Sequence, residues 1–341
     1  MFSGGLAEVI LSKICVLGAG SWAMGISILL ADNGHEVVMW SAVKEELELL
    51  KRDRGNPRFL PGITLPESIT FEAELEKAVH DKDVIVMAVA SKFVRSVAAS
   101  LKGIIPAAVM IVNLAKGIEE ESLLTPKQII EDELPEAKVF VLSGPSHAEE
   151  VSRRLPTAVT IAGDNKEETE ILQRIFASQV FRVYTSQDSL GVELGAALKN
   201  VIALAAGMAD GLGYGDNTKA ALITRGIREM SRLAVKMGAD FETMFGLSGV
   251  GDLIVTCASM HSRNRRAGIL IGQGKTMDEA VSEVNMVVEG IVSAAAAKKL
   301  AQKFDVEMPI VNAVNRVLFE GESARDAVNE LMGRDFKQET E

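Results

Sequence analysis

A strand that runs directly into a glycine-rich turn constrains the fold of this chain more than any other feature. The apolar run ICVL leads into GAGSWAMG, so Gly18, Gly20 and Ala23 fill a G-x-G-x-x-A pattern. The first glycine allows a tight turn, the second lets the backbone approach a pyrophosphate, and the small third residue keeps the helix close to its strand. The N-terminus of that helix then faces the anion. The pattern predicts a dinucleotide site, with a purely structural glycine turn as the alternative.

Short β-branched runs alternate with longer amphipathic segments from Lys13 to about Tyr184. This alternation is typical of βαβ units around a parallel sheet. We therefore expect an α/β chain whose N-terminal domain is a Rossmann-like, doubly wound sheet. The expected strands are ICVLG from Ile14, EVVMW from Glu36, DVIVMAV from Asp83, VMIVN from Val109, KVFVL from Lys138, TAVTIA from Thr157 and FRVY from Phe181.

The strand signal nearly disappears after Tyr184. Apolar residues recur three and four apart through 190–209, 220–237 and 291–304, which predicts amphipathic helices. The turn-rich sequence TSQDSLG separates the two patterns. We predict an NAD(P)-binding Rossmann-like domain over 1–188 and an all-α substrate-binding and catalytic domain over 189–341.

The acidic composition excludes some partners. A net charge of -11 and a pI of about 5.1 argue against a surface that coats nucleic acid or anionic lipid. An anionic ligand must therefore be held by a local basic pocket. The chain has two cysteines, Cys15 and Cys257, and its four histidines lack metal-ligand spacing, so we expect neither a disulfide framework nor a metal site.

The sequence also gives expectations about location. The N-terminal MFSGGLAEVILSK lacks the basic start and long apolar centre of a secretory signal. The apolar stretch 201–208 is followed at once by Asp210 and several glycines, and it is much shorter than the roughly 20 residues of a membrane span. We expect a cytoplasmic protein with no membrane span.

The end of the second predicted strand normally distinguishes the two nicotinamide cofactors, because an acid there bonds the ribose 2′-hydroxyl and a basic residue accepts a 2′-phosphate. Trp40, Ser41, Ala42 and Val43 offer neither, and Lys44 is the nearest cation. We hypothesise that either NADP(H) or NAD(H) binds, with a preference for NADPH.

Two motifs in the first half carry polar groups just beyond predicted strands. VNLAKG places Lys116 there, and SGPSHA places Gly144 and Ser146 there. Ligands bind at the carboxyl ends of strands in open α/β sheets, so these residues are candidates for the site. A solvated loop lysine is the alternative interpretation of Lys116.

The helical half offers a second set. GAALKN sets Lys199 among small and apolar residues, where an ammonium needs a partner or a task, although snorkelling to the surface is an alternative. GVGDLIVTC provides Asp252. HSRNRR then concentrates Ser262, Arg263 and Asn264 with two more arginines, and such a helix start can clamp a phosphate, although a charged run is more often a solvated face.

Taken in order, GAGSWA, NLAKG, SGPSHA, GAALKN, LITRG, GVGDLIVTC, SRNRR and VVEG resemble the NAD(P)-dependent glycerol-3-phosphate dehydrogenases, the bacterial type most closely, from about Lys13 to Arg334. The resemblance implies cofactor contacts, beyond the glycine-rich turn, from Ser21, Trp22, Lys116, Ala148, Arg263, Val287 and Glu289. It implies substrate contacts from Lys116, Gly144, Ser146, Lys199, Asp252, Ser262, Arg263 and Asn264. Family members often have a basic residue or histidine where this chain has Ala42.

The resemblance also implies a mechanism and a setting. Hydride passes from the reduced nicotinamide to the ketone carbon of dihydroxyacetone phosphate, while Lys199, the catalytic acid, protonates the developing alkoxide. Lys116 stabilises that charge, Asp252 orients Lys199, and Arg263 with Asn264 anchors the phosphate. A homodimer that supplies sn-glycerol 3-phosphate to phospholipid synthesis is expected.

Two other functions stay open at this point. A two-domain β-hydroxyacid dehydrogenase would have a similar shape but would bind a carboxylate, which the SRNRR cluster disfavours. A dinucleotide-sensing regulator without turnover would not need Lys116, Lys199 and Asp252 together with an anion clamp.

Overall fold

The computed structural model describes residues 11–106, 109–336 and 338–339, so most of the N-terminal segment on which the signal prediction rests lies outside the described residues. The described chain divides into two compact units. The first, here called the sheet unit, extends to Lys116 and then comprises Leu124–Glu193. The second, the helical unit, comprises Gly117–Leu123 and the described residues from Leu194 onward.

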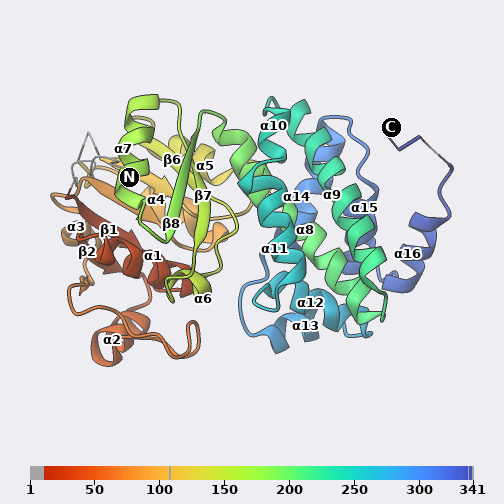
Figure 1. Cartoon of the computed structure of the whole chain (residues 1–341), viewed down its shortest axis with the longest axis horizontal. Helices are drawn as coiled ribbons and strands as arrows, with labels where there is room; N and C mark the ends of the chain where they lie inside the picture. Colours follow the sequence, from red (N-terminus) through yellow and green to blue (C-terminus); the bar gives the residue numbers. More distant parts are fainter. Residues whose placement is uncertain (1–10, 107–108, 337, 340–341) are drawn as a thin grey trace, which may run out of the picture. The chain divides into compact units, whose positions relative to one another are not determined.

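The sheet unit contains an eight-stranded sheet in the order β3-β2-β1-β4-β5-β6-β7-β8 (Figure 1). The predicted Rossmann-like sheet is confirmed, and only β3 falls outside the predicted runs. The strands are β1 (Lys13–Leu17), β2 (Glu36–Trp40), β3 (Thr70–Phe71), β4 (Val84–Met87), β5 (Met110–Asn113), β6 (Lys138–Ser143), β7 (Thr157–Ala162) and β8 (Phe181–Ser186).

One strand pair departs from the predicted parallel arrangement. β7 runs antiparallel to β6, with Val141 opposite Ala162, while every other neighbouring pair is parallel. A parallel crossover needs a helix long enough to return along the sheet. The connection over 144–156 contains only the four-residue helix α6 (Ala148–Val151), so the chain reverses direction instead.

Helices cover both faces of the sheet, which explains the nearly continuous apolar runs of its strands. In β1, Ile14 and Val16 belong to one core cluster, and Cys15 and Leu17 to the other. The first cluster includes residues of α1 (Ser21–Asp32), α2 (Lys44–Asp53), α6 and α7 (Lys166–Phe176). The second includes residues of α3 (Leu75–Val79), α4 (Val94–Ser100) and α5 (Pro126–Glu133).

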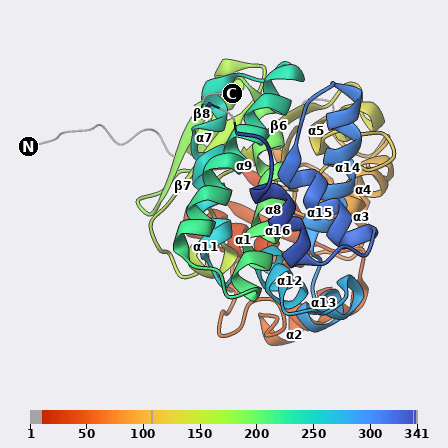
Figure 2. The ribbon, with the colours of Figure 1, turned by 90° about the vertical axis from the view of Figure 1, so that its right-hand side faces the viewer.

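The helical unit has no strand among its described residues, so the all-α prediction is confirmed. In Figures 1 and 2, α8 lies inside this unit with the other long helices around it. The elements are α8 (Ser189–Gly211), whose residues up to Glu193 belong to the sheet unit, α9 (Asp216–Lys236), α10 (Phe241–Met244), the π-helix η2 (Leu247–Gly251), α11 (Asp252–Ala258), α12 (Arg263–Gly272), α13 (Met277–Val284), α14 (Glu289–Lys303), α15 (Pro309–Phe319) and α16 (Ala324–Met332).

By length and composition alone, two helical segments of the described chain would suffice to cross a membrane. These are Ser189–Gly211, with a mean hydropathy of 1.4, and Phe241–Ala258, with 1.2. The apolar window of the first is entirely buried in the protein and that of the second is 39% buried. A core helix of a globular unit has the same composition, and α8 is such a helix.

Glycines bring α8 and α12 into backbone contact. A Cβ atom on Gly207 of α8 would lie 2.2 Å from the Arg265 carbonyl oxygen, and one on Gly268 of α12 would lie 2.2 Å from the Leu204 carbonyl oxygen. Gly211 and Gly272 repeat the contact one turn along. Because small residues four apart allow close helix approach, α12 is held tightly against α8, which carries Lys199.

Candidate active site

The first glycine of the turn between β1 and α1 has no substitute. Gly18 has a φ of +132°, and a Cβ there would lie 2.6 Å from the Ala88 carbonyl oxygen. Its N–H donates to the Trp40 carbonyl oxygen at 2.7 Å, which joins the turn to the end of β2. Ala23 is fully buried, as expected for the residue that keeps the helix near its strand.

The second glycine is open to a ligand. Gly20, the residue before α1, has an ordinary φ of -75°, and a Cβ there would meet no atom of the described chain within 4 Å. No side chain caps α1, and the indole Nε1 of Trp22 is buried without a hydrogen-bond partner. An open approach to a helix N-terminus beside an unused donor fits a dinucleotide phosphate.

The end of β2 holds a carboxylate that the sequence pattern did not reveal. The Ser41 hydroxyl accepts the Val43 N–H at 3.2 Å and lies 3.5 Å from a carboxylate oxygen of Glu46 on α2. Ala42 and Lys44 are exposed. The end of β2 itself carries no acidic residue, and the acidic side chain found there comes from the following helix, α2.

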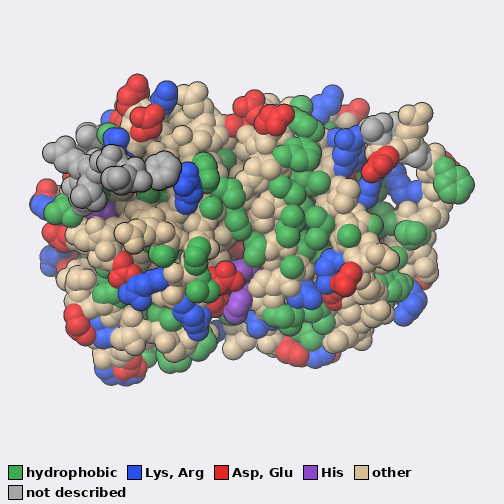
Figure 3. All heavy atoms as spheres, viewed as in Figure 1, with side chains coloured by type: hydrophobic (Ala, Val, Ile, Leu, Met, Phe, Trp, Pro, Cys, Tyr) green, Lys and Arg blue, Asp and Glu red, His purple; other side chains and the backbone are tan. Residues whose placement is uncertain are grey.

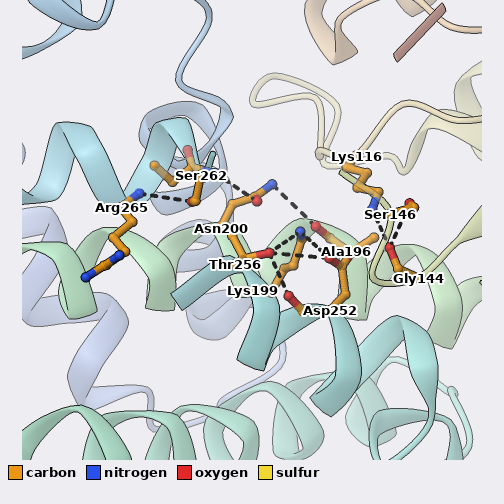
Figure 4. Close-up of polar contacts among 11 residues, drawn as sticks. Lys116, Gly144, Ser146, Ala196, Lys199, Asn200, Asp252, Thr256, Ser262 and Arg265 are labelled. Atoms are coloured by element: carbon orange, nitrogen blue, oxygen red, sulfur yellow. Dashed lines mark hydrogen bonds and ion pairs between the residues drawn. The ribbon is translucent and has the colours of Figure 1, made fainter. Parts of the chain in front are cut away.

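Three predicted residues of the sheet unit meet at the ends of neighbouring strands (Figure 4). The carbonyl oxygen of Gly144, just after β6, accepts one hydrogen bond from the Lys116 ammonium and one from the Ser146 hydroxyl, each at 3.0 Å. Lys116 follows β5, which pairs with β6. Lys116 is half-buried and directed at this carbonyl, so the interpretation as a solvated loop lysine is wrong.

Three residues of the helical unit form a buried polar group (Figure 4). The Lys199 ammonium donates to a carboxylate oxygen of Asp252 and to the hydroxyl of Thr256, each at 2.7 Å. The Thr256 hydroxyl donates to the Asp252 backbone carbonyl at 2.6 Å. All three residues are buried, so Lys199 does not snorkel to solvent.

Local structure places each member of this group. Lys199 lies on the core helix α8, and Asp252 begins α11 directly after the π-helix η2. A Cβ on Gly195 of α8 would lie 2.7 Å from the Ser248 carbonyl oxygen of η2, so glycine is required for η2 to approach α8. Thr256 lies one turn after Asp252 and therefore on the same face of α11. π-Helical turns of this kind are frequent at functional sites.

The start of α12 is built around a bridging amide. The Asn264 side chain donates to the Asn200 side-chain oxygen at 2.9 Å and accepts the Gly290 N–H at 2.9 Å, which links α8, α12 and α14. The Ser262 hydroxyl caps α12 by accepting the Arg265 N–H at 3.1 Å. Arg263, the first residue of the helix, is half-buried.

The arginines of the SRNRR cluster do not all serve to bind an anion. Arg265 donates from Nε to Asp210 at 2.8 Å and from a terminal nitrogen to the Ala258 carbonyl oxygen at 2.8 Å. Lys219 also contacts Asp210. Arg265 therefore serves the packing of the helical unit.

The remaining predicted cofactor contacts lie at helix starts. Ala148 begins α6 and is buried, and a Cβ on Gly25 of α1 would lie 3.6 Å from the Ala148 Cβ. Val287 and Glu289 are half-buried at the start of α14, next to Gly290. Ala148 thus lies beside the glycine-turn helix, and the other two lie near Gly290 in the sequence, whose N–H donates to the Asn264 side chain.

Cysteine chemistry plays no part at this group. Cys257 is adjacent to Thr256, and burial raises the pKa of its thiol to about 12. The thiolate is the reactive form of cysteine, so this side chain is inert at neutral pH.

Sequence reasoning missed three residues that the structure places here: Thr256, Asn200 as the partner of Asn264, and Glu46. The spacing of Asp252 and Thr256 on one helix was the available signal for the first. Asn200 depends on a contact between residues 64 positions apart in the sequence. Glu46 lies only five positions after Ser41.

Comparisons with known proteins agree over nearly the whole chain. Residues 13–169 match the model of the NAD-dependent glycerol-3-phosphate dehydrogenase N-terminus, and residues 188–329 match that of the C-terminus. The chain is 58% identical over 329 residues to a glycerol-3-phosphate dehydrogenase (NAD(P)+) of Agathobacter rectalis, covering 96% of this chain and 98% of the relative. A Fusobacterium nucleatum protein of the same name is 60% identical over 329 residues, with the same coverage.

A solved structure is similar as well. The crystal structure of glycerol-3-phosphate dehydrogenase from Coxiella burnetii at 2.1 Å resolution has a TM-score of 0.92 and 36% sequence identity to this chain. The match covers 95% of this chain and 99% of the Coxiella chain.

Proposed function

The chain belongs to the NAD-dependent glycerol-3-phosphate dehydrogenases, and from this premise we propose how its residues interconvert dihydroxyacetone phosphate and sn-glycerol 3-phosphate. It is an oxidoreductase that uses NAD(P)H, and its product supplies glycerophospholipid synthesis. The observation that carries the proposal is the buried Lys199 ammonium held by Asp252 and Thr256. Reduction of a ketone needs a proton donor, and a buried ammonium held in a fixed direction can supply that proton.

The glycine-rich turn would hold the pyrophosphate of the cofactor. Gly18 shapes the turn, Gly20 leaves the approach open, and the first N–H groups of α1 face the anion. When bound, the reduced nicotinamide supplies the hydride that reduces the ketone carbon. The further contacts that we propose come from Ser21, Trp22, Ala23, Lys116, Ala148, Arg263, Val287 and Glu289.

Lys199 is the proposed catalytic acid. As the ketone carbon is reduced, its oxygen becomes an alkoxide, and the Lys199 ammonium gives it a proton and is left as a neutral amine. Asp252 and Thr256 fix the direction of the Nζ atom through bonds of 2.7 Å. In the reverse reaction the neutral amine takes the hydroxyl proton.

Two further groups of residues bind or stabilise the negative charges of the substrate. Lys116, held on the Gly144 carbonyl with Ser146, stabilises the negative charge that develops on the ketone oxygen. Arg263 and the start of α12, shaped by Ser262 and Asn264, bind the phosphate. Binding energy from that remote phosphate aligns the carbonyl for reaction.

One assay tests the function and the role of Lys199. The purified chain should consume NADH or NADPH when given dihydroxyacetone phosphate, and far more slowly with a 2-keto acid, which presents a carboxylate. Lys199→Ala should lower kcat by about 10²–10⁴-fold, the usual range for loss of a general acid. Lys236→Ala, at the exposed end of α9, is the control and should keep wild-type kcat. A Lys199→Ala enzyme within threefold of wild type would remove Lys199 from the role.

We also propose that the chain works as a cytoplasmic homodimer. Large apolar side chains are exposed on α9, α10 and α11 and in the connections that follow α10 and α11, and Figure 3 shows hydrophobic side chains gathered over this region. The exposed residues are Val235, Phe241, Phe245, Ile254 and Met260. Exposed apolar patches of this kind mark protein interfaces. Phe245→Glu should shift the sedimentation mass from dimer to monomer, and an unchanged mass would place the interface elsewhere.

A further inference from the structure

Glu193 lies at one of the three places where the chain passes between its two units, and its side chain contacts segments near the other two. The chain leaves the sheet unit after Lys116, returns at Leu124 and leaves again after Glu193. Glu193 is a buried residue of α8 and belongs to the sheet unit. It is not among the candidate site residues that the sequence predicted. Its hydrogen-bond partners are Asn113, shortly before the first crossing, and Lys127, shortly after the second.

One carboxylate oxygen accepts both of these bonds. Glu193 Oε1 accepts the Asn113 side-chain amide at 3.2 Å and the Lys127 backbone N–H at 2.8 Å. Because Lys127 lies in the first turn of α5, the carboxylate caps that helix from another element.

Asn113 passes this constraint to the loop that carries Lys116. Its side-chain oxygen accepts the Ala115 N–H at 3.0 Å, and its side-chain nitrogen donates to the Ala115 carbonyl oxygen at 3.1 Å. Both backbone polar groups of Ala115 are therefore tied to one amide, and Lys116 follows directly. The Lys116 ammonium then reaches the Gly144 carbonyl.

We propose that Glu193 is a positioning residue for Lys116, acting through the Asn113 amide, which folds residues 113–116 into the turn that presents the ammonium. This inference rests on the proposed role of Lys116 in the reaction. Glu193 touches neither substrate nor cofactor in this assignment. The Glu193 carboxyl group restricts the Asn113 side chain to one orientation. This restriction in turn limits the orientations of Lys116.

The chemistry of the carboxyl group supports a task beyond packing. Burial raises the pKa of Glu193 to about 7, the nearby Glu131 adds to that rise, and the Thr125 hydroxyl, the Lys127 N–H and the Lys127 ammonium oppose it. That ammonium also pairs with Glu131 and Asp164. A buried carboxylate is costly compared with an apolar side chain of the same size. Here it is kept where it joins Asn113 to the start of α5.

The chain contains a matched control. Glu229 on α9 is also buried, its pKa is also raised to about 7 by burial, and its carboxylate accepts the N–H groups of Ile310 and Val311 in the first turn of α15. It therefore has the burial and the capping role of Glu193, and the contacts recorded for it involve none of the proposed site residues. A change that substitution causes at both positions is attributed to folding. A change that only substitution of Glu193 causes is attributed to the positioning of Lys116.

Steady-state kinetics of Glu193→Leu, Glu193→Gln and the corresponding Glu229 variants separate the two roles. We expect Glu193→Leu to lower kcat/KM for dihydroxyacetone phosphate by about 10- to 100-fold, because displacement by about 1 Å costs up to that much. Glu193→Gln, which keeps an acceptor oxygen, should restore it to within about fivefold of wild type. Glu229→Leu should lower the thermal midpoint and leave kcat/KM within about twofold. Equal losses of kcat/KM for the two Leu variants would overturn the proposal.

A double-mutant cycle tests the route through Lys116. If Glu193 acts through Lys116, Glu193→Leu should cost at most about twofold in a Lys116→Ala background. A full, multiplicative loss there would refute positioning of Lys116. Should Glu193→Leu not fold, Asn113→Ala, which leaves the Lys127 cap intact, gives the same cycle. A Lys116→Ala enzyme with wild-type kinetics would instead defeat the proposed role of Lys116, a failure distinguishable from that of the Glu193 link.

Discussion

Gly268→Ala should separate α12 from α8 and disturb the phosphate end of the site. The new Cβ would lie 2.2 Å from the Leu204 carbonyl oxygen and 2.9 Å from the Gly207 Cα, whereas ordinary contacts begin near 3.4 Å. Both neighbours are backbone atoms of α8, so no side chain can rotate away. The helices must move apart by about 1 Å, the difference between the ordinary contact and the 2.2 Å approach.

The energetic result is the sum of two opposing effects. Overpacking of this kind costs about 1–3 kcal/mol, and the better helix propensity of alanine returns up to about 1 kcal/mol. Because the clash is with rigid backbone, we expect a net loss near 2 kcal/mol. Arg263 and Asn264 move with α12, so KM for dihydroxyacetone phosphate should also rise, by about tenfold or more.

Urea denaturation and steady-state kinetics measure the two consequences. The midpoint should fall without a change in the m-value, because the surface exposed on unfolding stays the same. Gly25→Ala is the control, since its Cβ would lie 3.5 Å from the nearest atoms and alanine should be neutral or slightly stabilising there. A Gly268→Ala protein as stable and as active as wild type would refute the close approach of the two helices.

Three further predictions follow from the site and the core. Thr256→Val removes the hydroxyl that accepts a hydrogen bond from the Lys199 ammonium and should cost about 1.5–3 kcal/mol in unfolding free energy and at least tenfold in kcat, while Thr256→Ser should restore kcat. Glu46→Gln removes the carboxylate beside Ser41 and should lower KM for NADPH relative to NADH; an unchanged ratio would show that Glu46 does not select the cofactor. The pKa of Glu229 is raised from 4.5 to about 7, so its contribution to stability is present below pH 4.5 and is lost as pH rises through 7. Relative to Glu229→Gln, wild type should therefore lose about 3 kcal/mol between these pH values in urea denaturation, and a constant difference would contradict the shift.

The sequence predicted the positions of most strands because they carry short runs rich in β-branched residues, and those of β1, β2 and β4 are apolar on both faces. It could not predict the direction of β7, since side-chain alternation is the same in a strand read either way. The short link through α6 is the feature that reverses the chain. β3, with only Thr70 and Phe71, is too short to give a periodic signal.

The site residues were also predicted only in part from the sequence. Lys199 was predicted from its unusual local setting and Asp252 from the family resemblance, and the structure pairs them across 53 residues of sequence. Arg265 shows the limit of prediction from neighbouring residues. It lies in an arginine-rich run typical of a phosphate site, but its partner is Asp210, which lies on another helix. Glu193 gave no signal at all, since an isolated acid in an apolar helix is recognised only once its partners are known.

The excursion over Gly117–Leu123 also bears on how the protein is made. Its ion pair between Glu120 and Lys299 joins residues separated by 179 positions, so the ribosome releases one partner long before the other exists. The dinucleotide-binding half can therefore emerge and begin to fold, but this loop has to wait for the C-terminal helices. No single cut in the chain yields two self-sufficient fragments, and complementation from separately expressed halves should need an overlapping copy of these residues.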